Sequence, residues 1–336
     1  MSDEIKPLKK RKLKEDLTKV CINCARDPCI CDTLKPSDEL MKGRSVTIDI
    51  IDDPVLPDTQ AQHDGRGITI QKVGVTNLRL PIIVKTQFEH ARSGVQQTIG
   101  TFKATVEVPG NQKGTHMSQI ISHIYDRTKR VVSIDALREI TNDLKKDVEE
   151  LNASKAHIEL DFTYFIWNTT PFTKIKSPVP VEVAFIVSDY HADRLRVKTP
   201  VMTCCPCSVN MCEGKAHNQR CYVTIEVEAN DWVWIEDLVK YSEEAASVKI
   251  HTVLRRSDER EVVLKAHRNP KFVEDVIRDV KELLDRDKRI DWYKIEVESM
   301  ESIHAHNAYA ELECERGTEF HDEDIYRKLK GDDVSD

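Results

Sequence analysis

The chain has 336 residues, with 50 Lys and Arg against 58 Asp and Glu, and a formal net charge of −8. Hydrophobic residues make up 40% and charged residues 32%, which is typical of a soluble globular protein of roughly two domains. The acidic balance argues against nucleic acid as a partner, because phosphate contacts need a basic face. Apolar runs are only a few residues long and the N-terminus lacks an apolar signal region, so we expect a cytoplasmic protein with no membrane span.

Ordered patterning begins after a long first segment. Residues 1–66 combine a basic run at Lys6–Lys14 with turn-forming Pro, Asp and Gly, and we expect an irregular N-terminal extension there. We then expect a first module over residues 67–190, a second over 191–320 and a charged tail over 321–336.

In the first module, alternating apolar residues predict a strand at 102–108. Apolar residues spaced by three and four predict a helix over 117–124. Ser133 is expected to cap a second helix over 134–151, and alternation then predicts a strand at 158–166.

The same order recurs in the second module. Alternation predicts strands at 223–228 and 293–297. Between them we expect one helix capped by Asp231 and another with Asn269 as N-cap and Pro270 as its first residue. Strands that flank helix pairs predict an α+β fold, with antiparallel sheets and the helix pairs on one face.

The ten cysteines are clustered. Four lie between Cys21 and Cys31, five lie between Cys204 and Cys221, and Cys314 stands alone. In a chain without a secretory signal, clusters indicate metal binding or catalysis rather than disulfides. The spacing in the first cluster is compatible with a structural metal and also with free, oxidisable thiols.

The densest chemical signal joins Cys204 and Cys205 to His217. Thiolate and imidazole are good ligands for zinc-like metals, and a loop leading back to the next strand would bring them together. A cysteine–histidine nucleophile pair is a second interpretation, and buried free thiols are a third.

Two further segments carry groups of the right type. Glu301 and His304 lie where a late strand is expected to end, and they suit a metal or acid/base site or a polar surface. Glu259 lies in the charged segment 255–260, which alone predicts a solvated turn.

Glu274 is expected in the first turns of a helix, where the partial positive charge favours an ionised carboxylate. Such a carboxylate accepts two parallel N–H bonds, the donor pair that a guanine edge presents, although simple compensation of the helix dipole is the alternative. Lys113–His116 precedes the first helix and suits either an anion contact or an ordinary loop.

Six ordered blocks together resemble the type IB GTP cyclohydrolases. They are Lys72–Val75, Lys113–Ser118, Cys205–Ser208, Ala216–Arg220, Asn269–Asp275 and Glu301–His304. The resemblance runs from about Gly67 to Cys314 and implies two tandem tunnelling-fold modules, assembled as a homotetramer with sites between subunits. It implies conversion of GTP and water to 7,8-dihydroneopterin 3′-triphosphate and formate, the entry step of folate-type pterin biosynthesis.

The resemblance also implies roles for single residues. Cys205, His217 and His304 would be catalytic, and Glu274 would anchor guanine. One divalent metal (manganese, zinc or ferrous iron) would be held by Cys205, His217, Glu259, Glu301 and His304. It leaves open the metal, a triphosphate or cyclic phosphate product, and the basic residue that meets the triphosphate. The candidates for that contact are Arg220, Arg255, Arg256, Arg268 and Lys271.

Two alternatives stand beside this interpretation. One is a tunnelling-fold nitrile reductase, in which a cysteine attacks the substrate and NADPH supplies hydride. The other is a non-catalytic metal-binding interaction protein, with the Cys21–Cys31 cluster as its metal knuckle.

Overall fold

A computed structural model of the protein describes residues 59–60, 62–87, 94–146 and 153–316. These residues fall within one compact unit, Asp58–Asp336. In chain order the elements are β1 Ile70–Lys85, β2 Val95–Val108, α2 Met117–Arg127, β3 Val131–Val132, α3 Ile134–Lys146, β4 Ala156–Thr169, β5 Lys176–Ser188, β6 Arg194–Cys204, α4 Pro206–Met211, β7 Asn218–Ala229, α5 Ile235–Ala245, β8 Val248–Lys249, α6 Arg256–Arg268, α7 Val273–Arg286, β9 Ile290–Ser299 and β10 Ala308–Glu315.

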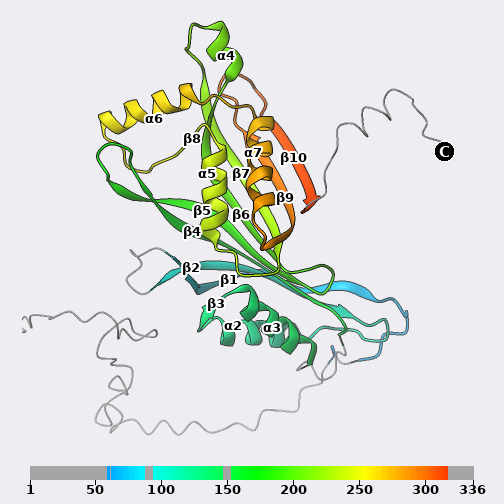
Figure 1. The fold of residues 1–336 in the computed structure, drawn as a ribbon. Helices are drawn as coiled ribbons and strands as arrows, with labels where there is room; N and C mark the ends of the chain where they lie inside the picture. The colour runs from blue at the N-terminus through cyan, green and yellow to red at the C-terminus, as the bar shows by residue number, and fades with distance from the viewer. Residues whose placement is uncertain (1–58, 61, 88–93, 147–152, 317–336) are drawn as a thin grey trace, which may run out of the picture. The chain divides into compact units, whose positions relative to one another are not determined.

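The strands form one ten-stranded sheet in the order β10-β9-β7-β6-β5-β4-β2-β1-β3, with β8 paired to β6 (Figure 1). Every pairing is antiparallel except that of β1 with β3. The first half runs strand, strand, helix, helix, strand, strand around the short β3, and the second half repeats this order with α4, β8 and α6 added, which confirms the predicted α+β fold. Because β5 pairs with β6, the sheet continues past residue 190, and the domain boundaries stay predictions.

Both helix pairs cover the same face of this sheet. Residues directly opposite each other on paired strands point to one face. A row of such partners crosses six strands and is buried throughout: Phe102, Leu160, Phe185, Leu195, Val227 and Tyr293. Helices α2, α3, α5 and α7 contribute their apolar faces to the same core, so the opposite face of the sheet is left polar.

The start of α3 follows its prediction. The Ser133 hydroxyl accepts a hydrogen bond from the Ala136 N–H at 3.2 Å, which satisfies a donor that the helix itself cannot. The apolar side chains of Leu137 and Leu144 are fully buried beneath it. The predicted continuation over 147–151 lies outside the described residues.

Two other predicted helix starts are wrong. Helix α5 begins at Ile235 rather than at Asp231, because Asp237 accepts the Trp234 N–H at 3.3 Å and caps the helix from its third residue. The Asp231 carboxylate accepts the N–H of its own neighbour, Trp232, at 2.7 Å.

The second error concerns Asn269 and Pro270. Asn269 ends α6, and its N–H donates to the Lys265 and Ala266 carbonyls. Helix α7 begins three residues after Pro270, where Asp275 accepts the Phe272 N–H at 2.9 Å. Both errors have one cause, since an acid at the third helical position reaches back and replaces the expected N-cap.

Every helix in the described part of the chain is too short or too polar to cross a lipid bilayer.

Candidate functional site

Two backbone hydrogen bonds gather the predicted site segments at one end of the sheet. The Cys205 N–H donates to the His217 carbonyl at 3.2 Å, which closes the β6–β7 connection. The Lys271 N–H donates to the Cys204 carbonyl at 3.0 Å. Cys205, His217 and the start of α7, where Glu274 lies, therefore belong to adjoining stretches of backbone.

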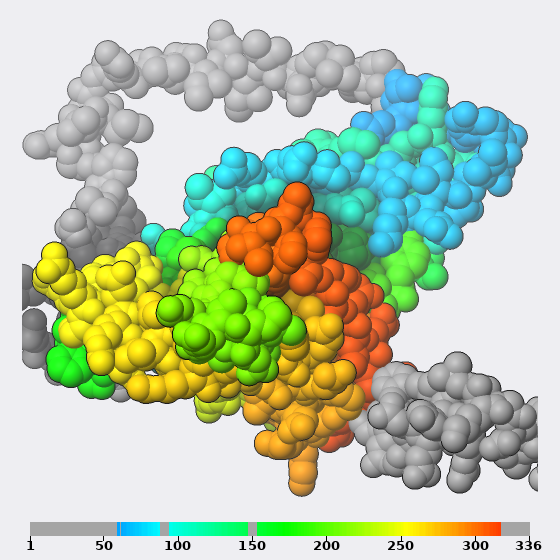
Figure 2. Space-filling model, turned by 90° about the horizontal axis from the view of Figure 1, so that it is seen from above, coloured from blue at the N-terminus to red at the C-terminus, as the bar shows by residue number. Residues whose placement is uncertain are grey.

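A third bond adds the segment after β9, because the Met300 N–H donates to the Arg220 carbonyl at 2.8 Å. Glu301 follows directly. On the surface, the green α4 segment, the yellow α6 segment and the orange segment after β9 gather on one face of the molecule (Figure 2).

Two neighbouring thiols have opposite surroundings. Cys205 is the N-cap of α4, where Pro206 is pre-organised as the first helical residue, and its partly exposed sulfur accepts the Ser208 N–H at 3.5 Å. Cys204 is fully buried among Val248, Val262 and Ala266, and burial raises the pKa of its thiol. The first thiol is available to a ligand and the second is part of a small core.

The His217 ring has a defined tautomer. Its Nδ1 lies 2.9 Å from the Gln219 Oε1. The Gln219 amide is oriented in turn, because its Nε2 donates to the Glu301 carboxylate at 3.1 Å and a carboxylate only accepts. Nδ1 therefore carries the proton, and the Nε2 lone pair of His217 is left for a metal or an acid.

Two buried hydroxyl groups, those of Ser299 and Thr203, form a hydrogen-bonded chain that ends at the Glu301 carboxylate. The Ser299 hydroxyl donates to the Glu301 Oε1 at 2.9 Å and lies 3.1 Å from the Thr203 hydroxyl. The other carboxylate oxygen of Glu301 lies 3.8 Å from the His217 Nδ1.

Gln219, Ser299 and Thr203 were not expected from the sequence to take part in the site. A signal was present, because Gln219 occupies a core-facing position of β7, in phase with Cys221 and Val223. A polar side chain in the apolar phase of a strand indicates a buried hydrogen-bond network.

Glu259 lies on a helix rather than in the predicted charged turn. It is exposed in the first turn of α6, beside the buried Asp258. Burial opposes ionisation of Asp258, but hydrogen bonds from Thr173 and the Phe172 N–H hold its pKa well below its usual range. Asp258 thus fixes the segment that presents Glu259.

His304 and Glu274 are exposed. The His304 ring stacks on His306, with the ring centres 5.1 Å apart. Glu274 is the second residue of α7, as its predicted role at a helix start requires, and its carboxylate forms no ion pair within the described part of the chain.

The donor set fits a metal in part. Cys205 and the free Nε2 of His217 supply sulfur and nitrogen, with the Glu301 carboxylate beside them, a combination suited to zinc-like ions. Among the residues described, no three His, Cys, Asp or Glu side chains converge closely enough to hold one ion. Glu259 and His304 are therefore not joined to this set within one chain.

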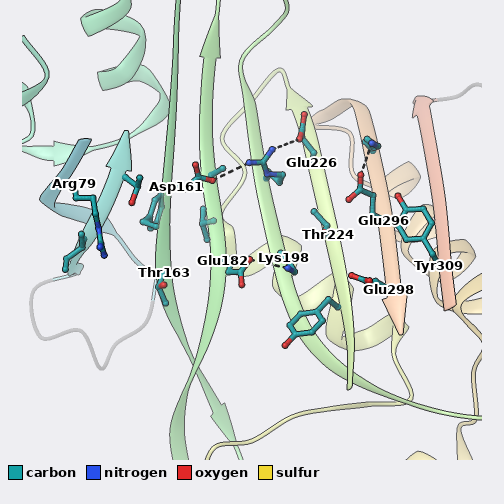
Figure 3. A pocket seen from close by; sticks show the side chains of 18 residues that line it. Arg79, Asp161, Thr163, Glu182, Lys198, Thr224, Glu226, Glu296, Glu298 and Tyr309 are labelled. Atoms are coloured by element: carbon teal, nitrogen blue, oxygen red, sulfur yellow. Dashed lines mark hydrogen bonds and ion pairs between the residues drawn. The ribbon is translucent and has the colours of Figure 1, made fainter. Parts of the chain in front are cut away.

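A cavity of about 700 Å³ lies on the polar face of the sheet (Figure 3). Its charges are largely paired: Arg196 contacts Asp161 at 3.3 Å and Glu226 at 3.6 Å, and Lys198 contacts Glu182 at 3.3 Å. No predicted metal ligand lines it, so these ion pairs form a structured polar wall away from the thiol and imidazole.

A smaller cavity of about 370 Å³ adjoins this wall. Its basic side chains are Lys198, Arg220 and His251, and the acidic Glu182 lines it as well. In the described part of the chain Arg220 forms no ion pair, so its positive charge is uncompensated there.

Known proteins resemble this chain over most of its length. The family described as type I GTP cyclohydrolase folE2 matches residues 56–310. GTP cyclohydrolase FolE2 of Nitrosomonas eutropha is 41% identical over 268 residues, covering 79% of this chain and 97% of the relative. The enzyme of the same name from Caldicellulosiruptor bescii is 45% identical over 260 residues, covering 77% and 98%.

Among solved structures, uricase from Arthrobacter globiformis aligns with 76% of this chain and 97% of its own, at 7% identity and a TM-score of 0.46. The family assignment comes from the sequence relatives and the match over residues 56–310. The chain belongs to the type I GTP cyclohydrolase FolE2 family.

Proposed function

We propose that this protein is a metal-dependent GTP cyclohydrolase of the type IB kind. It would convert GTP and water to 7,8-dihydroneopterin 3′-triphosphate and formate. Family membership over residues 56–310 supports the reaction. The observation that supports the metal is the His217 ring, whose Nδ1–H is bound by Gln219 while Nε2 has no hydrogen-bond partner among the described residues.

Cys205 and His217 would hold the ion, with Glu301 beside them and Glu259 and His304 as further ligands. A sulfur and nitrogen pair suits zinc, and carboxylates widen the choice to manganese or ferrous iron. When bound, the ion would supply hydroxide near neutral pH for attack on C8 of the purine.

The chain's own side chains would position the substrate and move protons. Glu274, exposed and unpaired in the described residues, would accept the two N–H groups of the guanine edge. That contact would orient C8 and lower the entropic barrier to attack. His304, when it is not bound to the ion, would deliver a proton to N7, which makes C8 more electrophilic. His217 is less suited to this step, because its Nε2 would hold the ion and its Nδ1–H is directed at Gln219.

The activity test uses the full-length protein reconstituted with zinc, manganese or ferrous iron. Incubation with GTP should release formate and yield a pterin that fluoresces after oxidation. No turnover with any of the three metals would contradict the assignment, and NADPH consumption with a deazaguanine nitrile would favour the reductase instead.

The triphosphate contact follows from which basic side chains are already paired. Lys271 is bound to Asp279, and Arg268 lies 3.9 Å from Glu261. Arg220, Arg255 and Arg256 have no such partner among the described residues, and of these three Arg220 is the one that lines the 370 Å³ cavity. We assign Arg220 this contact. Arg220→Ala should raise KM for GTP by about tenfold, as expected for a lost charge-assisted bond, whereas Arg268→Ala should leave it unchanged.

The proposed assembly is a homotetramer with sites between subunits. It is supported by the exposed, separated positions of Glu259 and His304 in one chain. Mixing inactive Cys205→Ala and His304→Ala proteins under conditions of subunit exchange should restore turnover, because some sites would then hold both intact residues. No recovery, with sedimentation proving mixed oligomers, would assign all ligands to one chain.

The Cys21–Cys31 cluster lies outside the described residues. Removing residues 1–57 leaves the compact unit that begins at Asp58 and should preserve turnover. Loss of turnover would instead give this segment a part in the enzyme.

A further inference from the structure

A second site lies on the helix-covered side of the sheet, between the two helix pairs. It is a cavity of about 430 Å³ bordered by the first turns of α3 and α5, and none of the proposed catalytic residues lines it. Its floor contains Phe185, Leu195 and Val227, which belong to the buried row across the sheet. Its volume falls within the range of small-molecule sites.

One wall of this cavity is aromatic. Trp232 and Trp234 meet edge to face with ring centres 5.3 Å apart, and the Trp232 side chain is 41% exposed. The Lys85 ammonium lies 5.6 Å from the centre of the Trp232 ring. That ring face is therefore already placed to attract a cation.

The remaining wall is acidic. Asp135, Asp193, Asp231 and Glu236 line the cavity, with Lys85 as its basic residue. Asp193 is neutralised by Arg138, whose Nε lies 3.1 Å away. In the described chain the other three carboxylates have no Lys or Arg partner, so the cavity carries excess negative charge.

Glu236 also has an unused acceptor. Its Oε1 accepts from the Thr86 hydroxyl, the Gln87 N–H and the Tyr164 hydroxyl at 3.0, 2.9 and 2.5 Å. Its Oε2 is buried and accepts no hydrogen bond from any described residue. This unpaired oxygen leaves the negative charge of Glu236 only partly satisfied and adds to the acidic character of the wall.

We propose that this cavity binds a small planar aromatic cation with N–H donors, such as an amidinium or a protonated amino-heterocycle. The tryptophan wall stacks on the ring, and the carboxylates neutralise the charge. An aromatic anion of the same shape would meet three uncompensated carboxylates, and a neutral one would leave them unpaired. Because α3 and α5 belong to different halves of the chain, the ligand would tie the halves together.

The test compares three probes of one size and different charge: benzamidine, benzamide and benzoate. Each is titrated into the full-length protein while tryptophan fluorescence and the thermal midpoint are followed. Benzamidine should bind saturably and raise the midpoint, because a ligand of the folded state stabilises it by mass action. Benzamide should bind at least about tenfold more weakly and benzoate not at all.

Variants locate the binding. Asp135→Asn, at an exposed position, and Trp232→Leu should each weaken benzamidine about tenfold. The control is Trp292→Phe, since Trp292 stacks on Arg194 and does not line the cavity. Equal binding of benzamide and benzamidine, no binding of benzamidine, or unchanged affinity in both cavity variants would each overturn the proposal.

Discussion

The two halves of the sheet carry a glutamine at equivalent register positions, but the two side chains make different contacts. Gln96 pairs with Val84 one step before the end of the β1–β2 ladder, and Gln219 pairs with Thr203 at the matching step of β6–β7. Gln96 binds the backbone of Phe165 on the neighbouring strand at 2.7 and 3.1 Å. Gln219 instead connects His217 to Glu301, so the first glutamine links two strands of the sheet and the second links two residues of the proposed site.

The halves also differ in what lies between their repeated elements. In the first half β3 leads directly to α3, whereas in the second α6 separates β8 from α7. The short helix α4 likewise interrupts the β6–β7 connection. Cys205 and Glu259 lie in these additions, so two of the proposed metal ligands belong to segments that the first half lacks.

The largest difference is expected between substitutions of the two adjacent cysteines, Cys204 and Cys205. Cys205→Ala should abolish metal binding and reduce turnover at least about a thousandfold, because the metal-derived hydroxide is lost. Cys204→Ala should keep the metal and lower the free energy of unfolding by about 1 kcal/mol, since only packing is lost. Metal content and a denaturant melt of both variants measure this. Full activity in Cys205→Ala would remove it from the site.

Substitutions of two neighbouring acidic residues on α7, Glu274 and Asp275, should likewise have different effects, one on activity and the other on stability. Glu274→Gln should lower kcat/KM for GTP by about a hundredfold or more, because a charged acceptor for two N–H groups is lost. Asp275→Ala should leave kcat/KM near the wild-type value and cost about 1 kcal/mol of stability through the lost helix cap. Steady-state kinetics that ranked them in the reverse order would break the assignment of guanine recognition to Glu274.

Substitutions of the two equivalent glutamines, Gln96 and Gln219, should differ by a smaller amount in metal affinity. Gln219→Leu should weaken metal affinity about 10- to 100-fold, as is usual when the partner of a metal-binding histidine is removed. Gln96→Leu should change only stability. Competition with a chelator of known affinity reports both. Identical metal affinities for the two variants would show that the His217 tautomer does not depend on Gln219.

The smallest expected effect lies in the first half and concerns pH. Burial lowers the pKa of His157 on β4 to about 4, from the usual 6.5. Between these values the unfolded chain takes up a proton that the folded chain does not, so stability falls as the pH drops through this window. His157→Gln should make that fall shallower without changing turnover near neutral pH. Urea melts at several pH values test it, and an unchanged slope would contradict it.

The repeated framework was predictable because its strands and helices alternate cleanly between apolar and polar positions. Helix ends were less so, since Asp237 and Asp275 act from inside their helices while Asp231 and Asn269 have the residue types expected of a cap. Helix α6 escaped prediction because its buried positions include Asp258, which hides its apolar period.

Some residues of the candidate site could be predicted from the sequence and others could not. Cys205, His217 and Glu301 could be named from residue type and order, and the structure brings their backbone segments together. Gln219 acts through hydrogen bonds to residues distant in sequence, which spacing alone does not reveal. All five metal ligands stay predictions, and among the described residues of one chain Glu259 and His304 do not converge with the other three.

The junction between the two halves, where β5 pairs with β6, affects how the chain unfolds on heating. Among the described strands, β5 and β6 pair there over Glu182–Ile186 and Arg194–Lys198 alone, yet the buried row of side chains continues across this junction. The two halves therefore share one hydrophobic core. A gene split at this junction would yield two fragments with bare strand edges and half a core each, so calorimetry of the intact chain should record a single cooperative transition.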